Sequence, residues 1–414
     1  MKKSVWLFIL LLMILNFFYI KPIGTLILIG RGIVFLAMEL LWLFIGVTYY
    51  KADTHNPLQK APKYKFVGLL YLFLIPSMIM ATSLFNQTWT QNLITYRTFS
   101  LFLAIPAFFH VVPSEKDVIK ACTWIVILIA VITILHTYIA PELFFEDVRI
   151  TEIMWKIRHG MTSDFLYPTE GLEFLVILLY YYCGRLYKNF NNRDMLKAMA
   201  LFLILAVFQS RSNLFPAMLI LGFTIINSRG INVYIKSFVA ILSLSVLIFG
   251  LGDMIAKLLA DTQRELSTSY NPRVVALDYF FDLKNKGIPE IIFGTGAISF
   301  QTSDYVSNLQ AMHIHYSDLG FIGFWHQFGI LPIGIFIYCL IRGFVKARGI
   351  PLYIKYIALH ITICGATISY FDTPIRDIWF CLFYYLYWYY RVRTGGKPRK
   401  RIHIPSLSAD SSHT

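Results

Sequence analysis

Long apolar runs alternate with short polar stretches along almost the whole of the 414-residue chain. Twelve runs are long enough to be interpreted as membrane-spanning helices, each of which needs about 20 residues. The predicted spans are 4–20, 32–50, 66–85, 93–112, 118–140, 165–184, 196–209, 213–227, 232–250, 319–341, 352–370 and 374–391. The seventh and eighth spans are short and adjoin the tripeptide Ser210-Arg211-Ser212, so we interpret them as a broken pair that does not fully cross.

The composition agrees with this interpretation, because 57% of the residues are hydrophobic and only 14% are charged. Soluble domains are about half apolar and a quarter charged, and outer-membrane barrels alternate polar with apolar residues. We therefore predict an all-α, polytopic integral membrane protein with about twelve transmembrane helices. Its parts are residues 1–250 (spans one to nine), 251–318 (a large outer loop), 319–391 (spans ten to twelve) and 392–414 (a basic tail).

The basic residues fix a predicted orientation. The net charge is +14, and 24 of the 37 lysines and arginines fall at the same set of span ends. Basic residues accumulate in cytoplasmic loops, so both termini are predicted to be cytoplasmic, and the charge calls for no nucleic-acid partner. The opposite side is richer in arginine than in lysine. Arginine there works against the insertion bias, and it is the residue that grips phosphate or carboxylate with two parallel hydrogen bonds.

Two outer arginines are the strongest candidates for binding an anion. Arg211 lies in the polar cluster Gln209–Asn213 between two apolar runs, where a charge is costly unless it faces a polar cavity. Arg273 follows Asn271-Pro272, which predicts the start of an amphipathic helix at the membrane surface. The alternatives are that Arg211 reaches for the interface and that Arg273 touches lipid headgroups. Further candidates at outer span ends are Arg97, Arg376 and Glu170. The two glutamates of this region, Glu170 and Glu173, are interpreted either as counter-charges to the arginines or as groups that line a cavity.

The outer mouth of span ten carries candidate acid–base chemistry. His313, His315 and Asp318 combine two imidazoles with a carboxylate, which is the make-up of a general base and its orienting partner. An interfacial histidine without chemistry is the alternative. No set of His, Cys or acidic residues has the spacing of a metal site, so neither a metal nor another cofactor is predicted. Gly294-Thr295-Gly296 favours a tight turn over a phosphate contact.

At these positions the sequence resembles the superfamily of bacterial O-antigen polymerases and O-antigen ligases. The resemblance rests on four segments between about residues 165 and 340: Gln-Ser-Arg-Ser (209–212), Asn-Pro-Arg-Val-Val-Ala-Leu (271–277), Ile-Ile-Phe-Gly-Thr-Gly (291–296) and His-Tyr-Ser-Asp-Leu-Gly-Phe-Ile-Gly-Phe (315–324), continuing to Gly329. Their order is that of the polymerase branch. Outside this region only the number of spans supports the match.

The resemblance implies a GT-C-like glycosyltransferase that needs no metal. It would join undecaprenyl-pyrophosphate-linked repeat units of O-antigen, capsule or exopolysaccharide at the outer face of the inner membrane, where the donor, the acceptor and the bilayer are its partners. A chain-length regulator and a flippase are further implied partners. Arg211 and Arg273 match the arginines expected to hold the pyrophosphate, and His313 or His315 matches the histidine expected to assist the acceptor hydroxyl. The alternatives are an O-antigen ligase and a transporter of polysaccharide or lipid-linked oligosaccharide.

Overall fold

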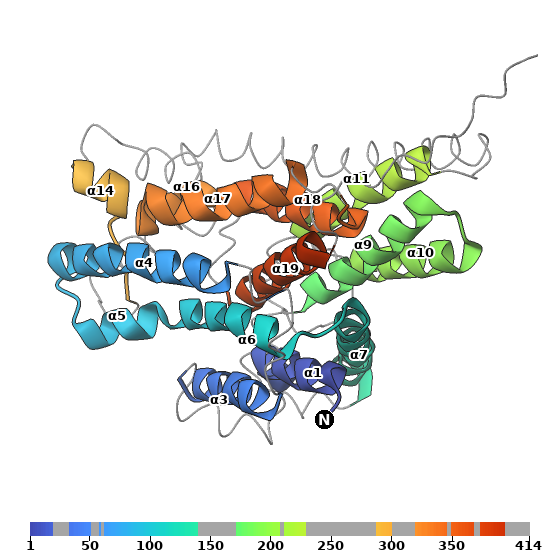
Figure 1. The fold of residues 1–414 in the computed structure, drawn as a ribbon, viewed down its shortest axis with the longest axis horizontal. Helices are drawn as coiled ribbons and strands as arrows, with labels where there is room; N and C mark the ends of the chain where they lie inside the picture. Colours follow the sequence, from blue (N-terminus) through green and yellow to red (C-terminus); the bar gives the residue numbers. More distant parts are fainter. Residues whose placement is uncertain are drawn as a thin grey trace, which may run out of the picture.

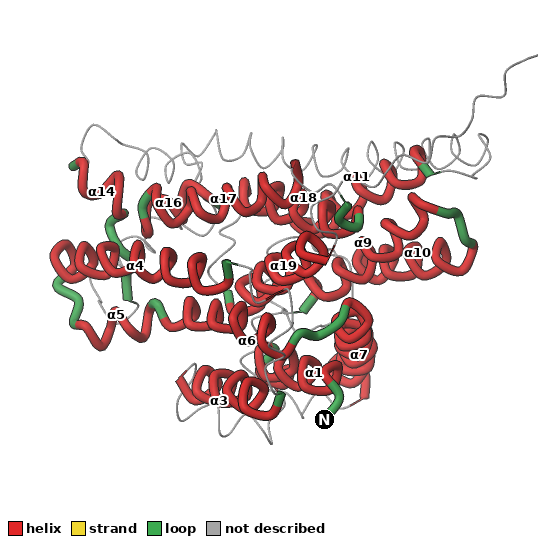
Figure 2. Tube along the Cα trace, viewed as in Figure 1, coloured by secondary structure: helices red, strands yellow, loops and turns green. Residues whose placement is uncertain are grey.

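The protein is a bundle of helices. The computed structural model describes residues 1–19, 33–50, 58, 62–139, 171–207, 211–228, 287–299, 319–345, 349–367 and 373–393. Within these ranges the chain forms helices and connecting turns and contains no strand (Figure 2). The predicted all-helical class is therefore confirmed. All five cysteines lie in the described ranges and are free, and four of them are buried.

The helices of the first half begin and end close to the apolar runs. They are α1 (Lys3–Ile14), η1 (Asn16–Tyr19), α3 (Ile33–Tyr49), α4 (Lys63–Phe85), α5 (Trp89–Thr95), η3 (Arg97–Leu103), α6 (Ala104–Val111), α7 (Glu115–Ile134) and the π-helical turn η4 (Leu135–Ile139). Capping boxes start α5 at Thr88 and α7 at Ser114. In each, the hydroxyl accepts a backbone N–H that the first turn would otherwise leave without a partner.

The second half supplies the other helices of the described ranges. They are α9 (Leu172–Lys188), α10 (Asn192–Val207), α11 (Arg211–Asn227), α14 (Ile288–Phe293), α16 (Phe321–Phe328), α17 (Ile330–Val345), α18 (Leu352–Thr367) and α19 (Pro374–Arg393). Every residue of α9 from Phe174 to Tyr180 is buried. Helix α9 packs against α7, α10, α11 and α18, which explains why this stretch of it is buried on all sides (Figure 1).

Several helices are suited to a membrane. Tyr64–Phe85 and Glu115–Ile139 are long and apolar enough to cross one, and the bent pair Trp89–Thr95 with Arg97–Val111 would make a third. Five shorter apolar helices accompany them: Lys3–Ile14, Leu36–Tyr49, Asn213–Asn227, Ile330–Val345 and Leu352–Ala366. These features suggest membrane association. The count of twelve spans stays a prediction, and the predicted ninth span (232–250) lies outside the described residues.

Two predicted spans differ from single helices. The span predicted at 93–112 bends by 56° between α5 and the stretch Arg97–Val111. The span predicted at 319–341 is divided into α16 and α17 by Gly329, whose φ of 81° lies in the left-handed region. A side chain there would place Cβ 2.1 Å from the Ile292 carbonyl oxygen, so glycine is required at this break.

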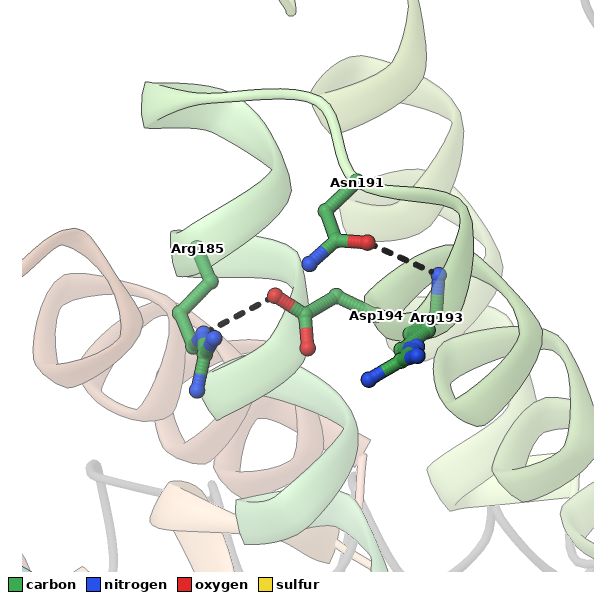
Figure 3. Close-up of polar contacts among 4 residues, drawn as sticks. All are labelled: Arg185, Asn191, Arg193 and Asp194. Carbon is green, nitrogen blue, oxygen red and sulfur yellow. Dashed lines mark hydrogen bonds and ion pairs between the residues drawn. The ribbon is translucent and has the colours of Figure 1, made fainter.

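The turn between α9 and α10 is held by polar contacts (Figure 3). Arg185 Nε lies 2.9 Å from Asp194 Oδ2, and the Arg193 N–H donates to Asn191 Oδ1 over 3.0 Å. The Tyr181 hydroxyl and the Asp194 carboxylate raise the pKa of Arg185 above its usual value. Asp194 also lies in the first turn of α10, where the helix dipole favours an anion. This charged turn belongs to the end of the bundle that the lysine and arginine distribution predicts to be cytoplasmic.

Reporter fusions would test that orientation. Fusions ending at Lys60, Asn191 and Lys346 are expected to report the cytoplasm, and a fusion at Asn285 is expected to report the outer side. The reason is the excess of basic residues at the first three positions. An outer signal at Lys346 would contradict the orientation and with it the predicted location of every outer candidate residue.

Candidate functional site

The structure describes part of the predicted site. Arg97 and Arg376 lie in the described ranges with their side chains, and Arg211 is placed as the first residue of α11. The remaining candidates lie outside the described residues: Glu170, Arg273, His313, His315 and Asp318.

A buried hydrogen-bond network joins the start of α11 to the middle of two other helices. Asn213, in the first turn of α11, lies with Oδ1 3.0 Å from His360 Nε2, and Tyr180 OH lies 2.6 Å from His360 Nδ1. The amide oxygen of Asn213 can only accept, so Nε2 carries the proton and Nδ1 accepts from the tyrosine. One neutral tautomer of His360 thus satisfies both contacts. We call Tyr180, His360 and Asn213 the histidine network.

The histidine network is enclosed. Tyr180 and His360 have no exposed surface, and Asn213 is 8% exposed. The ring of Trp379 on α19 lies edge-on to His360, with 5.0 Å between the ring centroids. One turn away along α18, Tyr356 OH accepts a hydrogen bond of 3.0 Å from Thr224 on α11. Helices α11 and α18 are therefore joined at two levels, and α9 and α19 complete the enclosure.

The network sets the depth at which α11 begins. Tyr180 is the middle residue of α9, and His360 lies at the middle of α18. Asn213 bonds at that level, and Arg211 precedes it by two residues, or about 3 Å of helix rise. The amino end of α11 is thus level with the middle of its neighbours. The first N–H groups of a helix lack intrahelical partners and carry a partial positive charge, so this end favours an anion.

A second pair of charges lies beside the same helices. Arg376 Nε is 4.0 Å from Glu173 Oε1, and the two side chains are 22% and 13% exposed. Glu173 lies in the first turn of α9, two turns before Tyr180, and Arg376 lies in the first turn of α19. The pair is therefore about 10 Å along α9 from the histidine network. Of the two interpretations of Glu173, the structure favours that of a counter-charge, and its partner is Arg376.

Arg97 has a local partner. Its Nη1 donates a hydrogen bond of 2.6 Å to the carbonyl oxygen of Ile94, three residues earlier. Among the described residues no carboxylate lies within 4.0 Å of Arg97. The described contact therefore places this arginine at the junction of α5 and η3.

The glycine motif packs against backbone. The Thr295 N–H donates to the His326 carbonyl over 2.8 Å, and the Gly296 N–H donates to the Gln327 carbonyl over 2.9 Å. A Cβ on Gly296 would lie 2.3 Å from Ala81 Cβ, and one on Gly294 would lie 2.3 Å from the Gln327 carbonyl oxygen. Both glycines have positive φ angles. The segment is therefore held between α4 and α16, as a turn-forming motif would be.

The glycine at the start of α16 packs against α18. Gly320 has a φ of 57°, and an added Cβ would lie 2.3 Å from the carbonyl oxygen of Gly365 on α18. Gly320 therefore holds the start of α16 against the end of α18. In the sequence it follows Asp318 by two residues.

Comparison with known proteins leaves the family open. No protein-family model matches the chain, and a search of curated proteins gives no significant match.

Sequence reasoning did not single out Tyr180 or His360. His360 is a polar residue inside a predicted span, which is itself a signal of a polar interior. Tyr180 belongs to a run of three tyrosines and gives no such signal. Asn213 was part of the polar cluster around Arg211, but its partner lies 147 residues away in the chain.

Replacing the central histidine tests the network. In His360→Leu, the Tyr180 hydroxyl and the Asn213 amide lose a buried partner, which costs about 1–3 kcal/mol for each unsatisfied group. We expect a clear fall in the unfolding temperature of the purified protein. Thr362→Val is the matched control, since within the described part of the chain the Thr362 hydroxyl bonds to the Ala358 carbonyl of its own helix, α18. Equal unfolding temperatures for His360→Leu and the wild type would show that the network does not stabilise the bundle.

Proposed function

We propose that the protein is an integral membrane glycosyltransferase that polymerises undecaprenyl-pyrophosphate-linked oligosaccharide units at the outer face of the bacterial inner membrane. The proposal begins from the resemblance of residues 165–340 to O-antigen polymerases. The observation that carries it furthest is the place of Arg211. This arginine begins a helix level with the middle of α9 and α18, beside a buried polar network.

That place suits a negatively charged leaving group. A helix start supplies N–H donors, and a guanidinium adds a fixed charge with paired donors. The charge of an arginine inside a membrane protein is costly unless an anion or a polar cavity compensates it. The pyrophosphate of a lipid-linked donor would supply that anion, with its polyprenyl chain in the bilayer.

The proposed reaction is a single displacement at the anomeric carbon of the donor glycan. The hydroxyl of the acceptor unit attacks this carbon as the carbon–oxygen bond to pyrophosphate breaks. Arg211 and Arg273 stabilise the charge on the departing undecaprenyl pyrophosphate. His313 or His315, oriented by Asp318, takes the hydroxyl proton. The growing glycan is thereby transferred to the non-reducing end of a new lipid-linked unit.

The Glu173–Arg376 pair has a supporting place in this proposal. Both residues lie in first turns of helices that surround the histidine network. A carboxylate near the phosphates would oppose their charge, so the role that fits Glu173 is to hold Arg376 in position. Arg376 is then an additional arginine for the substrate, and Glu170 and Arg97 are kept as further candidates.

Transport of a lipid-linked glycan is the second candidate, because transporters also contain broken helices with polar groups at mid-depth. The 56° bend between α5 and the stretch Arg97–Val111 is such a break. Ligation of finished chains to a lipid acceptor is a further alternative within the same superfamily. Purified protein in vesicles containing only lipid-linked repeat units separates them, because only a polymerase makes longer chains there.

Substitution of Arg211 tests the proposed role. Arg211→Ala is expected to lower the polymerisation rate by about 10- to 150-fold, which corresponds to the loss of one charge-assisted contact worth roughly 1.5–3 kcal/mol. Arg211→Lys should retain partial activity, because an ammonium group keeps the charge but not the paired donors. The measurement is the glycan chain-length distribution at equal protein levels in the membrane.

Arg193→Ala serves as the control. Arg193 is an exposed arginine in the first turn of α10, at the predicted cytoplasmic end. It should give wild-type chain lengths. Normal polymer from Arg211→Ala would contradict the proposed site, whereas a loss shared with Arg193→Ala would point to a general effect on folding.

A further inference from the structure

A pocket of about 360 Å³ lies away from the candidate site, between α4, α17 and α19. Its wall is mainly apolar and follows one face of α17 from Leu331 through Ile335 and Cys339 to Arg342. Those 11 residue steps cover roughly 16 Å of helix. Phe66 on α4 and Phe383 on α19 close the two sides. The pocket is therefore an elongated groove with a charged end.

That end carries cations and aromatic rings. Lys65 and Arg342 both line it, and no acidic residue does. Arg342 Nη1 donates a hydrogen bond of 2.7 Å to the Tyr338 hydroxyl. The guanidinium carbon of Arg342 lies 5.2 Å from the centroid of the Trp388 ring. Its Nε is buried and makes no hydrogen bond within the described part of the chain. No carboxylate of the described residues lies within 4.0 Å of Lys65 or Arg342.

The charged end of the groove lies at one end of each of the three helices that form it. Helix α4 begins there, and α17 and α19 end there. Arg391 and Arg393, in the last turn of α19, add to the positive charge. The distribution of basic residues predicts that this side faces the cytoplasm, where the membrane surface is negatively charged. An occupant must then combine a long apolar part with an anionic group at the level of Lys65 and Arg342.

We propose that the groove binds an anionic phospholipid of the cytoplasmic leaflet. One acyl chain lies along α17, and the phosphodiester lies between Lys65 and Arg342, where the ammonium and guanidinium groups balance its charge. Tyr338, Tyr387 and Trp388 surround the headgroup at the level that amphipathic aromatic residues prefer. The inference rests on the predicted membrane orientation and is independent of glycan transfer.

Gly334 offers a direct test because it lines the groove and a Cβ added there meets nothing within 4 Å. Gly334→Leu therefore fills the groove without a backbone clash. Gly68→Leu is the matched control, since Gly68 on α4 is equally open but does not line the groove. The contribution of the positive charge is tested with Arg342→Gln, and Lys120→Gln is its control. Lys120 also lies over a tryptophan, 4.9 Å from the Trp124 ring centroid, but on α7 and away from the groove.

The experiment titrates delipidated full-length protein in detergent with dioleoyl phosphatidylglycerol and, separately, with dioleoyl phosphatidylcholine, and counts bound lipids by native mass spectrometry. We expect one phosphatidylglycerol to bind about fivefold or more tightly than phosphatidylcholine, since each nearby cation favours an anionic lipid by about that factor. Gly334→Leu should abolish this first binding event. Arg342→Gln should weaken it by a similar factor, and both controls should bind as the wild type.

Equal affinity for the two lipids would overturn the proposal, as would unchanged binding in both Gly334→Leu and Arg342→Gln. Displacement of phosphatidylglycerol by undecaprenyl phosphate at equal concentration would assign the groove to the lipid carrier instead. Loss of a dimer in Gly334→Leu but not in Gly68→Leu would assign it to a second copy of the chain. Arg342→Gln keeps the test valid if the leucine variant fails to fold, and the chain-length assay on Arg211 variants reports separately on the proposed reaction.

Discussion

The arrangement of the central helices depends on a histidine that has to be satisfied from both sides. His360 lies at the middle of α18 with no exposed surface, so neither ring nitrogen can bond to bulk water. A buried polar group without a partner costs about 1–3 kcal/mol. Tyr180 supplies a donor from α9 and Asn213 supplies an acceptor from α11. Three helices are thereby fixed at one level, which apolar contacts alone would specify less sharply.

That level is the basis of the role proposed for Arg211. A start for α11 near the bundle surface would place its free N–H groups in water or among headgroups. Instead it begins level with the middle of its neighbours, where an anion gains most from a helix start and from arginine. The glycines of the second half add a different constraint. Gly296, Gly320 and Gly329 allow backbone to touch neighbouring helices, so α16 is held both to α4 and to the end of α18.

The helices themselves could largely be predicted from the sequence. The predicted 213–227 compares with α11 at Arg211–Asn227, and the predicted 374–391 compares with α19 at Pro374–Arg393. Apolar runs bounded by polar residues and proline contain this information. The points at which a predicted span is interrupted were harder to predict. The interruption between α16 and α17 at Gly329 involves a close backbone contact with Ile292, a residue far away in the chain.

The site could be predicted only in part. Arg211 and Asn213 stood out as polar residues between apolar runs, and Glu173 was considered as a counter-charge. The pairing of Glu173 with Arg376 and the hydrogen bond of Asn213 to His360 depend on which helices pack together. Local sequence patterns do not specify helix packing. The glycine motif shows the converse. Its spacing was visible in the sequence, but its role in helix packing required the neighbours Ala81 and Gln327.

The most direct measurement concerns the access of water to the start of α11. A cysteine at Ser212, next to Arg211, is treated with a membrane-impermeant maleimide from the outer or the cytoplasmic side of intact membrane vesicles. The wild type, whose five cysteines are buried or half-buried, gives the background. If α11 begins in a crevice open to the outer side, Ser212→Cys reacts from that side alone, and undecaprenyl pyrophosphate protects it. Reaction from the cytoplasmic side alone, or no reaction from either side, would contradict a substrate site at Arg211.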